Sequence, residues 1–88
     1  MAWTIEFGPG ARRELRKLDR PVQRRLLQYL EQRVLASDDP RQLGKPLHGD
    51  KGDLWSYRVG DYRIICMIED RRLVVVVVTV GNRREVYR

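Results

Sequence analysis

Residues 54–69, LWSYRVGDYRIICMIE, decide how this chain folds, because they describe two strands joined by a tight turn. Leu54 to Val59 and Tyr62 to Glu69 are rich in β-branched and aromatic residues, which favour strands. Between them, Gly60-Asp61 is a two-residue hairpin loop. A loop of that length fixes the register, so the sequence predicts which side chains face one another across the hairpin.

The predicted register separates an apolar face from a basic one. The apolar face, expected to be the core, collects Trp55, Tyr57, Val59, Tyr62, Ile64, Cys66 and Ile68. The other face collects Leu54, Ser56, Arg58, Arg63, Ile65 and Met67. It sets Arg58 directly across from Arg63, where like charges repel by on the order of a few tenths of a kcal/mol. A phosphate bound between them would turn that repulsion into attraction, whereas the alternative is that both side chains splay into water.

A third strand follows the hairpin. Asp70-Arg71 predicts a turn into Leu73 to Val80, a run rich in valine. Strict alternation places Leu73, Val75, Val77 and Thr79 on the core face, and Val74, Val76, Val78 and Val80 on the arginine face. A strand with apolar side chains on both faces is normally covered by other parts of a protein on both faces. The valine stripe beside Met67 and Ile65 is therefore a predicted docking site for another protein, unless the sheet curls and the first strand shields it.

The N-terminal half supplies a strand and two helices. Trp3, Ile5 and Phe7 alternate with polar residues, and Gly8-Pro9-Gly10 then breaks the strand. Helical spacing follows from Ala11, and again from Pro21, each with one apolar stripe. The stripes contain Ala11, Leu15 and Leu18 in the first helix, and Val22, Leu26, Tyr29 or Leu30, and Val34 in the second. Residues 37–53 are expected to form a loop.

These elements predict an α+β fold with the order β-α-α-β-β-β. The two helices form a hairpin that packs on one face of a mainly antiparallel, four-stranded sheet. The length of 88 residues leaves room for one core, so residues 1–88 are expected to be a single domain.

Charge points to the class of partner. Lys and Arg number 18 against 12 Asp and Glu, a net charge of +6, and 15 of the 18 are Arg. Arginine presents a planar fork of donors that matches phosphate, whereas lysine would serve equally well for solubility. The composition favours a polyanion or an acidic protein as partner, with simple surface solvation as the alternative.

Several classes of protein are excluded by composition. Cys66 and His48 are the single cysteine and histidine, so neither a disulfide framework nor an ordinary transition-metal site is expected, and no cofactor is predicted. The N-terminus lacks the basic and apolar regions of a signal peptide. The longest apolar run, Leu73 to Val78, is too short to cross a bilayer. We expect a soluble cytoplasmic protein with no membrane partner.

Four segments together resemble the RelE/ParE superfamily of bacterial toxins from type II toxin–antitoxin systems. They are residues 57–64 (YRVGDYRI), 80–87 (VGNRREVY), 11–18 (ARRELRKL) and 44–47 (GKPL). Each is short and degenerate, but their joint occurrence in this order, over essentially the whole chain, is fairly specific. The resemblance implies an mRNA endonuclease that acts on the ribosome without a metal ion and is held inactive by an antitoxin.

The resemblance also assigns roles to residues of the basic face. Arg63 matches the strand arginine that contacts the scissile phosphate, and Arg58 matches one of two basic residues on the preceding strand. Ser56 stands where the other, often a lysine, is found, and it is kept as a substrate-binding candidate. The antitoxin is expected to dock near Met67, Val74, Val76 and Val78.

The C-terminal segment completes the predicted site. Arg83 matches the arginine after the final glycine of the family, and Tyr87 matches a tyrosine that stacks or orients near the cut. Asn82 stands where many relatives carry histidine. Arg84 and Lys51 are further candidates for binding the RNA substrate.

Two other functions stay open at this point. ParE-type members of the superfamily share the fold but poison DNA gyrase instead of cutting RNA, and the absent lysine and histidine favour that function. A plain RNA-binding module would need only the basic surface. The outer faces of the two helices carry residues that either grip ribosomal RNA or are simply solvated: Arg12, Arg13, Arg16, Lys17, Arg20, Arg24 and Arg25.

Overall fold

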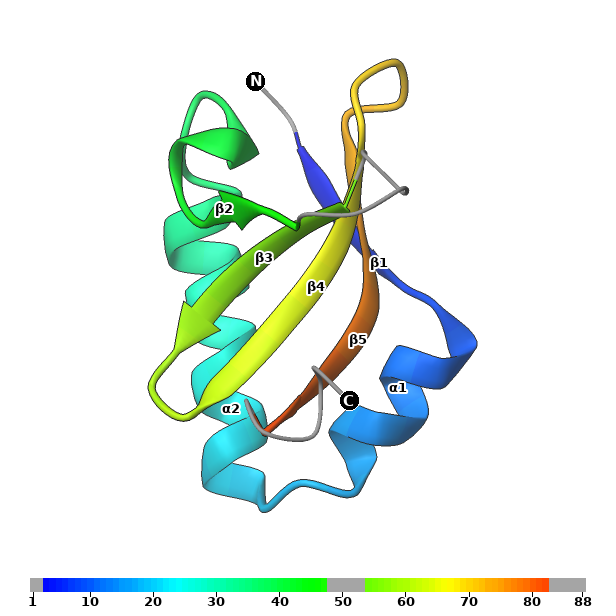
Figure 1. Ribbon diagram of the computed structural model, residues 1–88, viewed down its shortest axis with the longest axis vertical. Helices are drawn as coiled ribbons and strands as arrows, with labels where there is room; N and C mark the ends of the chain where they lie inside the picture. The colour runs from blue at the N-terminus through cyan, green and yellow to red at the C-terminus, as the bar shows by residue number, and fades with distance from the viewer. Residues whose placement is uncertain (1–2, 48–53, 83–88) are drawn as a thin grey trace.

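The computed structural model describes residues 3–47 and 54–82, which form two helical segments packed on one face of a sheet (Figure 1). The helical elements are α1 (Pro9–Arg16), α2 (Arg20–Tyr29), a π-helical turn η1 (Leu30–Val34) that continues α2, and a short 3-10 turn η2 (Pro40–Gln42). The strands are β1 (Thr4–Phe7), β2 (Lys45–Pro46), β3 (Leu54–Val59), β4 (Tyr62–Glu69) and β5 (Val74–Asn82). In Figure 1, α2 passes behind the sheet and α1 lies beside β5.

The predicted α+β fold is confirmed, with one strand more than expected. The sheet has the order β1-β5-β4-β3-β2 over the described residues, with β1 parallel to β5 and the other pairs antiparallel. The extra strand, β2, falls in the segment that the sequence assigned to a loop. Lys45 pairs with Ser56 and Pro46 with Trp55, which makes β2 an edge strand, the position in a sheet that tolerates proline.

The β3–β4 hairpin has the predicted bounds and the predicted register. Arg58 pairs with Arg63, Tyr57 with Ile64, and every other pair of the hairpin also matches the expected one. Gly60 adopts a φ of 61°, the left-handed conformation that this tight turn requires and that glycine adopts without strain.

The last strand departs from strict alternation at a β-bulge. Ile65 pairs with Thr79 but its neighbour Cys66 pairs with Val77, so Val78 is an extra residue on β5. Beyond the bulge the alternation shifts by one position. Val80 pairs with Ile64 and is buried in the core, while Thr79 faces the other side, so the predicted faces of these two residues were wrong.

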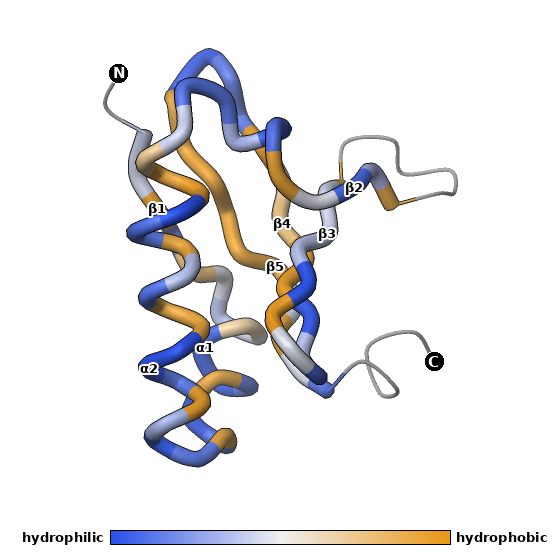
Figure 2. Tube along the Cα trace, turned by 90° about the vertical axis from the view of Figure 1, so that its left-hand side faces the viewer, coloured by the Kyte–Doolittle hydropathy of each residue, from blue (hydrophilic) through white to orange (hydrophobic). Residues whose placement is uncertain are grey.

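The core lies between the helices and the inner face of the sheet. The predicted helical stripe is confirmed, because Leu26, Leu30 and Val34 are buried with Tyr57, Ile64, Cys66, Val75 and Val77. Figure 2 shows β5 as hydrophobic along most of its length and α2 as alternating hydrophobic and hydrophilic turns. The first helix begins at Pro9, two residues before its expected start, since proline suits the first turn of a helix. No helix among residues 3–47 and 54–82 is long and apolar enough to cross a membrane.

Candidate functional site

The face of the sheet opposite the helices carries the Arg58–Arg63 pair. The two Cα atoms are direct partners in the ladder, so both side chains leave the same face. Their guanidinium groups diverge along the hairpin. Arg58 Nε donates to the carbonyl oxygen of Gly60 at 3.4 Å, whereas Arg63 Nη1 donates to Ser56 Oγ at 3.2 Å on the side away from the turn. Mutual repulsion favours this divergence, and the two acceptors named here are uncharged.

Ser56 orients the more buried of the two arginines. Its side chain is only 4% exposed, and its hydroxyl accepts the hydrogen bond from Arg63. Arg63 is itself half-buried, while Arg58 is exposed. Ordering an arginine before a ligand arrives lowers the conformational entropy lost on binding, so Ser56 is placed to preorganise Arg63.

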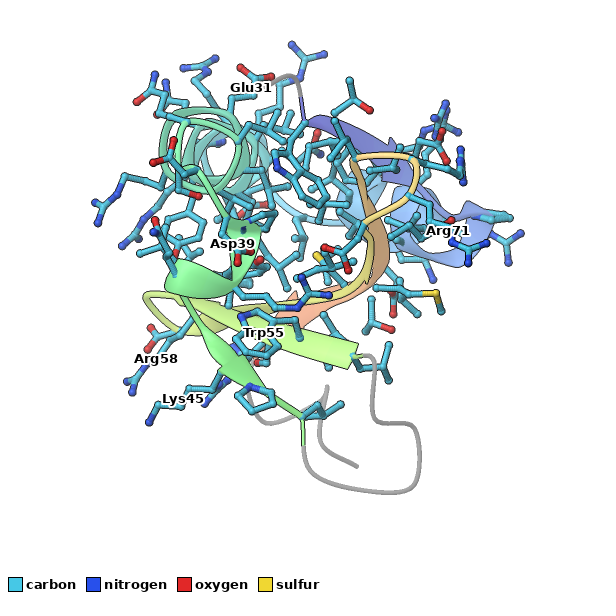
Figure 3. All side chains as sticks on the ribbon, turned by 90° about the horizontal axis from the view of Figure 1, so that it is seen from above. Glu31, Asp39, Lys45, Trp55, Arg58 and Arg71 are labelled. Atoms are coloured by element: carbon cyan, nitrogen blue, oxygen red, sulfur yellow. The ribbon has the colours of Figure 1, made fainter. Side chains whose placement is uncertain are left out.

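A lysine that the sequence interpretation missed lies beside Ser56. Lys45 is the direct ladder partner of Ser56, so its side chain leaves the same face as Arg58 and Arg63. Figure 3 shows Lys45 and Arg58 on the same side of the molecule, both directed outward. The signal was hidden because Lys45-Pro46 is too short and too rich in proline to be recognised as a strand from sequence.

Two aromatic side chains of β3 hold the segment that carries Lys45. Trp55 Nε1 donates to the Leu43 carbonyl oxygen at 2.6 Å, and the Tyr57 hydroxyl donates to the Pro40 carbonyl oxygen at 2.7 Å. Both bonds come from β3 and end on the backbone just before β2. The position of Lys45 is therefore fixed by β3 itself.

The apolar part of this face is smaller than the predicted valine stripe. Ile65 and Val74 are nearly buried, at 6% and 5% exposure. Val76 is half-buried, whereas Met67 and Val78 are 41% and 39% exposed. The docking surface expected from sequence thus reduces to Met67, Val76 and Val78, and Val78 protrudes because it is the bulge residue.

Four predicted site residues, Lys51, Arg83, Arg84 and Tyr87, lie outside the described part of the chain. The structure does describe the strand that leads to three of them. Gly81 pairs with Arg63, and β5 ends at Asn82, the partner of Tyr62.

The ion pairs between described residues lie at the other end of β4, around the β4–β5 turn. Arg41 binds Asp70 through two hydrogen bonds of 2.9 Å, and Arg72 binds Glu6 at 2.8 Å and Glu69 at 3.1 Å. The hydrogen bond from Arg41 lowers the pKa of the Asp70 carboxyl. Within the described ranges, no group of three or more His, Cys, Asp and Glu side chains is arranged to hold a metal ion.

Comparison with known proteins gives concordant matches. Residues 5–87 match the model of the family described as the ParE toxin of type II toxin–antitoxin systems, parDE. The toxin RelG of Mycobacterium tuberculosis is 32% identical over 88 residues, which covers 100% of this chain and 99% of RelG. The toxin RelE of the same organism is 32% identical over 78 residues, covering 89% of this chain and 78% of RelE.

Solved structures agree with the sequence relatives. A chain of the M. tuberculosis toxin–antitoxin complex RelBE2 superposes with a TM-score of 0.85 at 29% identity, covering 94% of this chain and 100% of that one. A chain of the intact Escherichia coli RelBE complex superposes with a TM-score of 0.75 at 29% identity, covering 92% and 96%.

Proposed function

The chain belongs to the ParE toxin family of type II toxin–antitoxin systems, and we propose that it is an endoribonuclease that cuts mRNA on the ribosome without a metal ion. The observation that carries the proposal is the Arg58–Arg63 pair on the face that the helices leave uncovered. Two guanidinium groups that leave the same face of the hairpin support binding of a phosphodiester group there, which arginine can bind through two parallel hydrogen bonds.

The proposed reaction uses the ribose of the substrate as the nucleophile. The 2′-oxygen attacks the adjacent phosphorus, the bond between phosphorus and the 5′-oxygen breaks, and the products are a 2′,3′-cyclic phosphate and a 5′-hydroxyl. Negative charge builds up on the phosphoryl oxygens in the transition state. Arg63, held by Ser56, and Arg58 are positioned to stabilise that charge, with Arg83 as a third proposed donor.

Proton transfer is the step for which this face is poorly equipped. Arginine stays protonated to above about pH 12, so neither Arg58 nor Arg63 can act as a general base. We propose that Tyr87 relays the proton and orients the base at the cut, and that Arg84 and Lys51 bind flanking phosphates. An enzyme with so few acid–base groups depends on precise alignment of its substrate, which is what binding in the ribosomal decoding site would provide.

The second partner in the proposal is a cognate antitoxin, bound on the same face. Two of the similar solved structures are RelBE toxin–antitoxin complexes, in which a toxin is bound to its antitoxin. Met67, Val76 and Val78 give this chain an exposed apolar surface beside the arginines. An antitoxin segment seated there would cover both the apolar residues and the phosphate site. Action on ribosomes would place the protein in the cytoplasm.

Poisoning of DNA gyrase is the second candidate function. It is favoured by the match to the ParE family model and by the serine at position 56, where a ribonuclease of this superfamily often has lysine. Lys45, on the neighbouring strand, places an amine on the same face and supports the nuclease instead.

A translation extract separates the candidates. Adding the purified chain is expected to produce mRNA fragments that end at the codon in the ribosomal A site. Arg63→Gln is expected to abolish them, whereas Arg71→Gln, an equal loss of charge on the exposed β4–β5 turn, keeps them. Accumulation of gyrase–DNA complexes without RNA fragments would show that the chain poisons gyrase instead. Binding of RNA with neither product would show that it is an RNA-binding module without catalytic activity.

A further inference from the structure

A groove runs between the second helix and the β3–β4 turn, at the edge of the face described above. Its volume is about 400 Å³. The lining comes from α2 and η1 on one side and from the hairpin on the other: Arg25, Gln28, Tyr29, Gln32 and Arg33, then Arg58, Val59 and Gly60. Three of these eight residues are arginines and none is acidic.

The glycine of the turn gathers two of the arginines. Arg58 Nε donates to the Gly60 carbonyl oxygen, which draws that guanidinium toward the turn. On the helix side, Arg25 Nη2 lies 2.9 Å from the point where a Cβ on Gly60 would be. With no Cβ at this position, the residue that makes the turn also lets the Arg25 guanidinium lie against it.

No carboxylate among the described residues forms an ion pair with these three arginines. Arg25 and Arg33 form no ion pair or hydrogen bond with any residue within 3–47 and 54–82, and Arg58 bonds only to Gly60 there. Asp61, next to Gly60 in the chain, forms no ion pair with them. Three like charges around one groove repel one another, and a bound anion relieves that repulsion.

The remaining lining supplies uncharged donors. Tyr29 contributes a hydroxyl, and Gln28 and Gln32 contribute amides. Burial raises the pKa of Tyr29 even though Arg33 acts in the opposite direction. The hydroxyl therefore stays protonated at neutral pH and can donate a hydrogen bond. Arginine, tyrosine and glutamine side chains are the donors that proteins direct at phosphate oxygens.

We propose that this groove is a second phosphate-binding site, which adjoins the Arg58–Arg63 site through Arg58, and that it takes a further backbone phosphate of RNA. An acidic peptide is the other ligand with the right charge, but a bound peptide relies on a buried apolar anchor. The groove offers little free apolar surface for one, since Val59 is 7% exposed and part of the core, and the Tyr29 ring already packs edge to face on Tyr57. The site rests on the RNA substrate proposed above but not on its cleavage.

The test uses RNA that cannot be cut. A fluorescent oligonucleotide with 2′-O-methyl riboses is titrated with the full chain, and binding is followed by anisotropy at several salt concentrations. Arg25→Gln/Arg33→Gln is expected to weaken binding about tenfold and to reduce its salt dependence. The matched control, Arg12→Gln/Arg13→Gln, removes the same charge from exposed positions of α1 and is expected to change affinity about twofold at most. In the ¹⁵N spectrum of the wild type, RNA is expected to shift the amide of Gly60.

Two results would overturn the assignment. Equal weakening by the two double variants would mean that only net charge matters. A glutamate oligomer of equal charge that shifts the Gly60 amide more strongly than the RNA does would assign the groove to an acidic peptide. Because the modified RNA has no free 2′-hydroxyl, either result is independent of whether the chain cleaves mRNA.

Discussion

The Tyr57→Phe substitution tests the contact that fixes the segment carrying Lys45. The Tyr57 hydroxyl donates to the carbonyl oxygen of Pro40 at 2.7 Å, and both residues are fully buried. Burial raises the pKa of Tyr57 well above its ordinary value, so the hydroxyl stays protonated and donates throughout the useful pH range. The substitution keeps the ring and removes only the donor.

The expected loss of stability comes from the Pro40 carbonyl oxygen, which is left without its hydrogen-bond donor. A buried carbonyl without its donor costs about 1 to 3 kcal/mol, and no solvent reaches Pro40 to compensate. At about 0.05 to 0.15 kcal/mol per residue, a chain of this length has a total stability of about 4 to 13 kcal/mol. The substitution therefore removes a sizeable share of the free energy of unfolding.

The measurement is denaturant unfolding followed by circular dichroism, in a buffer without phosphate. Tyr57→Phe is expected to lower the midpoint with an unchanged m-value. Tyr29→Phe is the matched control. The two rings pack edge to face at 6.1 Å, but the Tyr29 hydroxyl bonds to no residue within the described ranges, so its loss is expected to cost less than about 0.5 kcal/mol. Equal costs for the two substitutions would refute the role given to the Tyr57–Pro40 bond.

Three further predictions use the same unfolding assay. Asp70→Asn is expected to destabilise the protein at neutral pH, because Arg41 lowers the folded-state pKa of this carboxyl. The difference in free energy of unfolding from wild type should shrink as the pH falls below about 4. A difference that stays constant with pH would contradict this. Gly60→Ala is expected to cost about 1 to 2 kcal/mol, since alanine is strained at a φ of 61°, whereas the flexible Arg25 side chain can move away from the new methyl group. An unchanged midpoint would show that the turn can relax. Val78→Asp is expected to change stability by less than about 0.5 kcal/mol but to weaken binding of a co-expressed antitoxin at least about tenfold, and undiminished binding would remove Val78 from the docking surface.

The parts of the fold that sequence predicted are those with strong local signals. Gly60-Asp61 specifies a turn type, the turn specifies the register, and the Arg58–Arg63 pairing follows without knowledge of the rest of the molecule. The last strand had no such signal. A run of five valines (Val74 to Val78) is equally apolar on both faces, so nothing in it marks where the bulge inserts a residue and shifts Thr79 and Val80.

The candidate site was predictable only where it lies within one hairpin. Lys45 was missed because β2 exists through contacts made by Trp55 and Tyr57, which are ten or more residues away in the chain. The groove was missed for a similar reason. Arg25 and Arg33 lie eight residues apart in the helical segment, a spacing that predicts a shared face, but only the packing of α2 on the sheet brings that face to Gly60.

The separation of charge along β4 determines where an anion can bind. The eight residues of β4 place its two ends about 24 Å apart, roughly three times the Debye length of about 8 Å at physiological salt. Asp39, Asp70, Glu6 and Glu69 all pair with arginines around the β4–β5 end, and at that distance they contribute little to the potential at the β3–β4 turn. At the β3–β4 turn no described acidic residue, the neighbouring Asp61 included, forms an ion pair with Arg25, Arg33 or Arg58, so a ligand, solution ions or a partner protein can supply counter-charge there. An antitoxin that inhibits by covering this face can do so either by supplying carboxylates to the arginines or by blocking access from the apolar side at Val78. Only inhibition of the first kind should weaken as salt concentration rises.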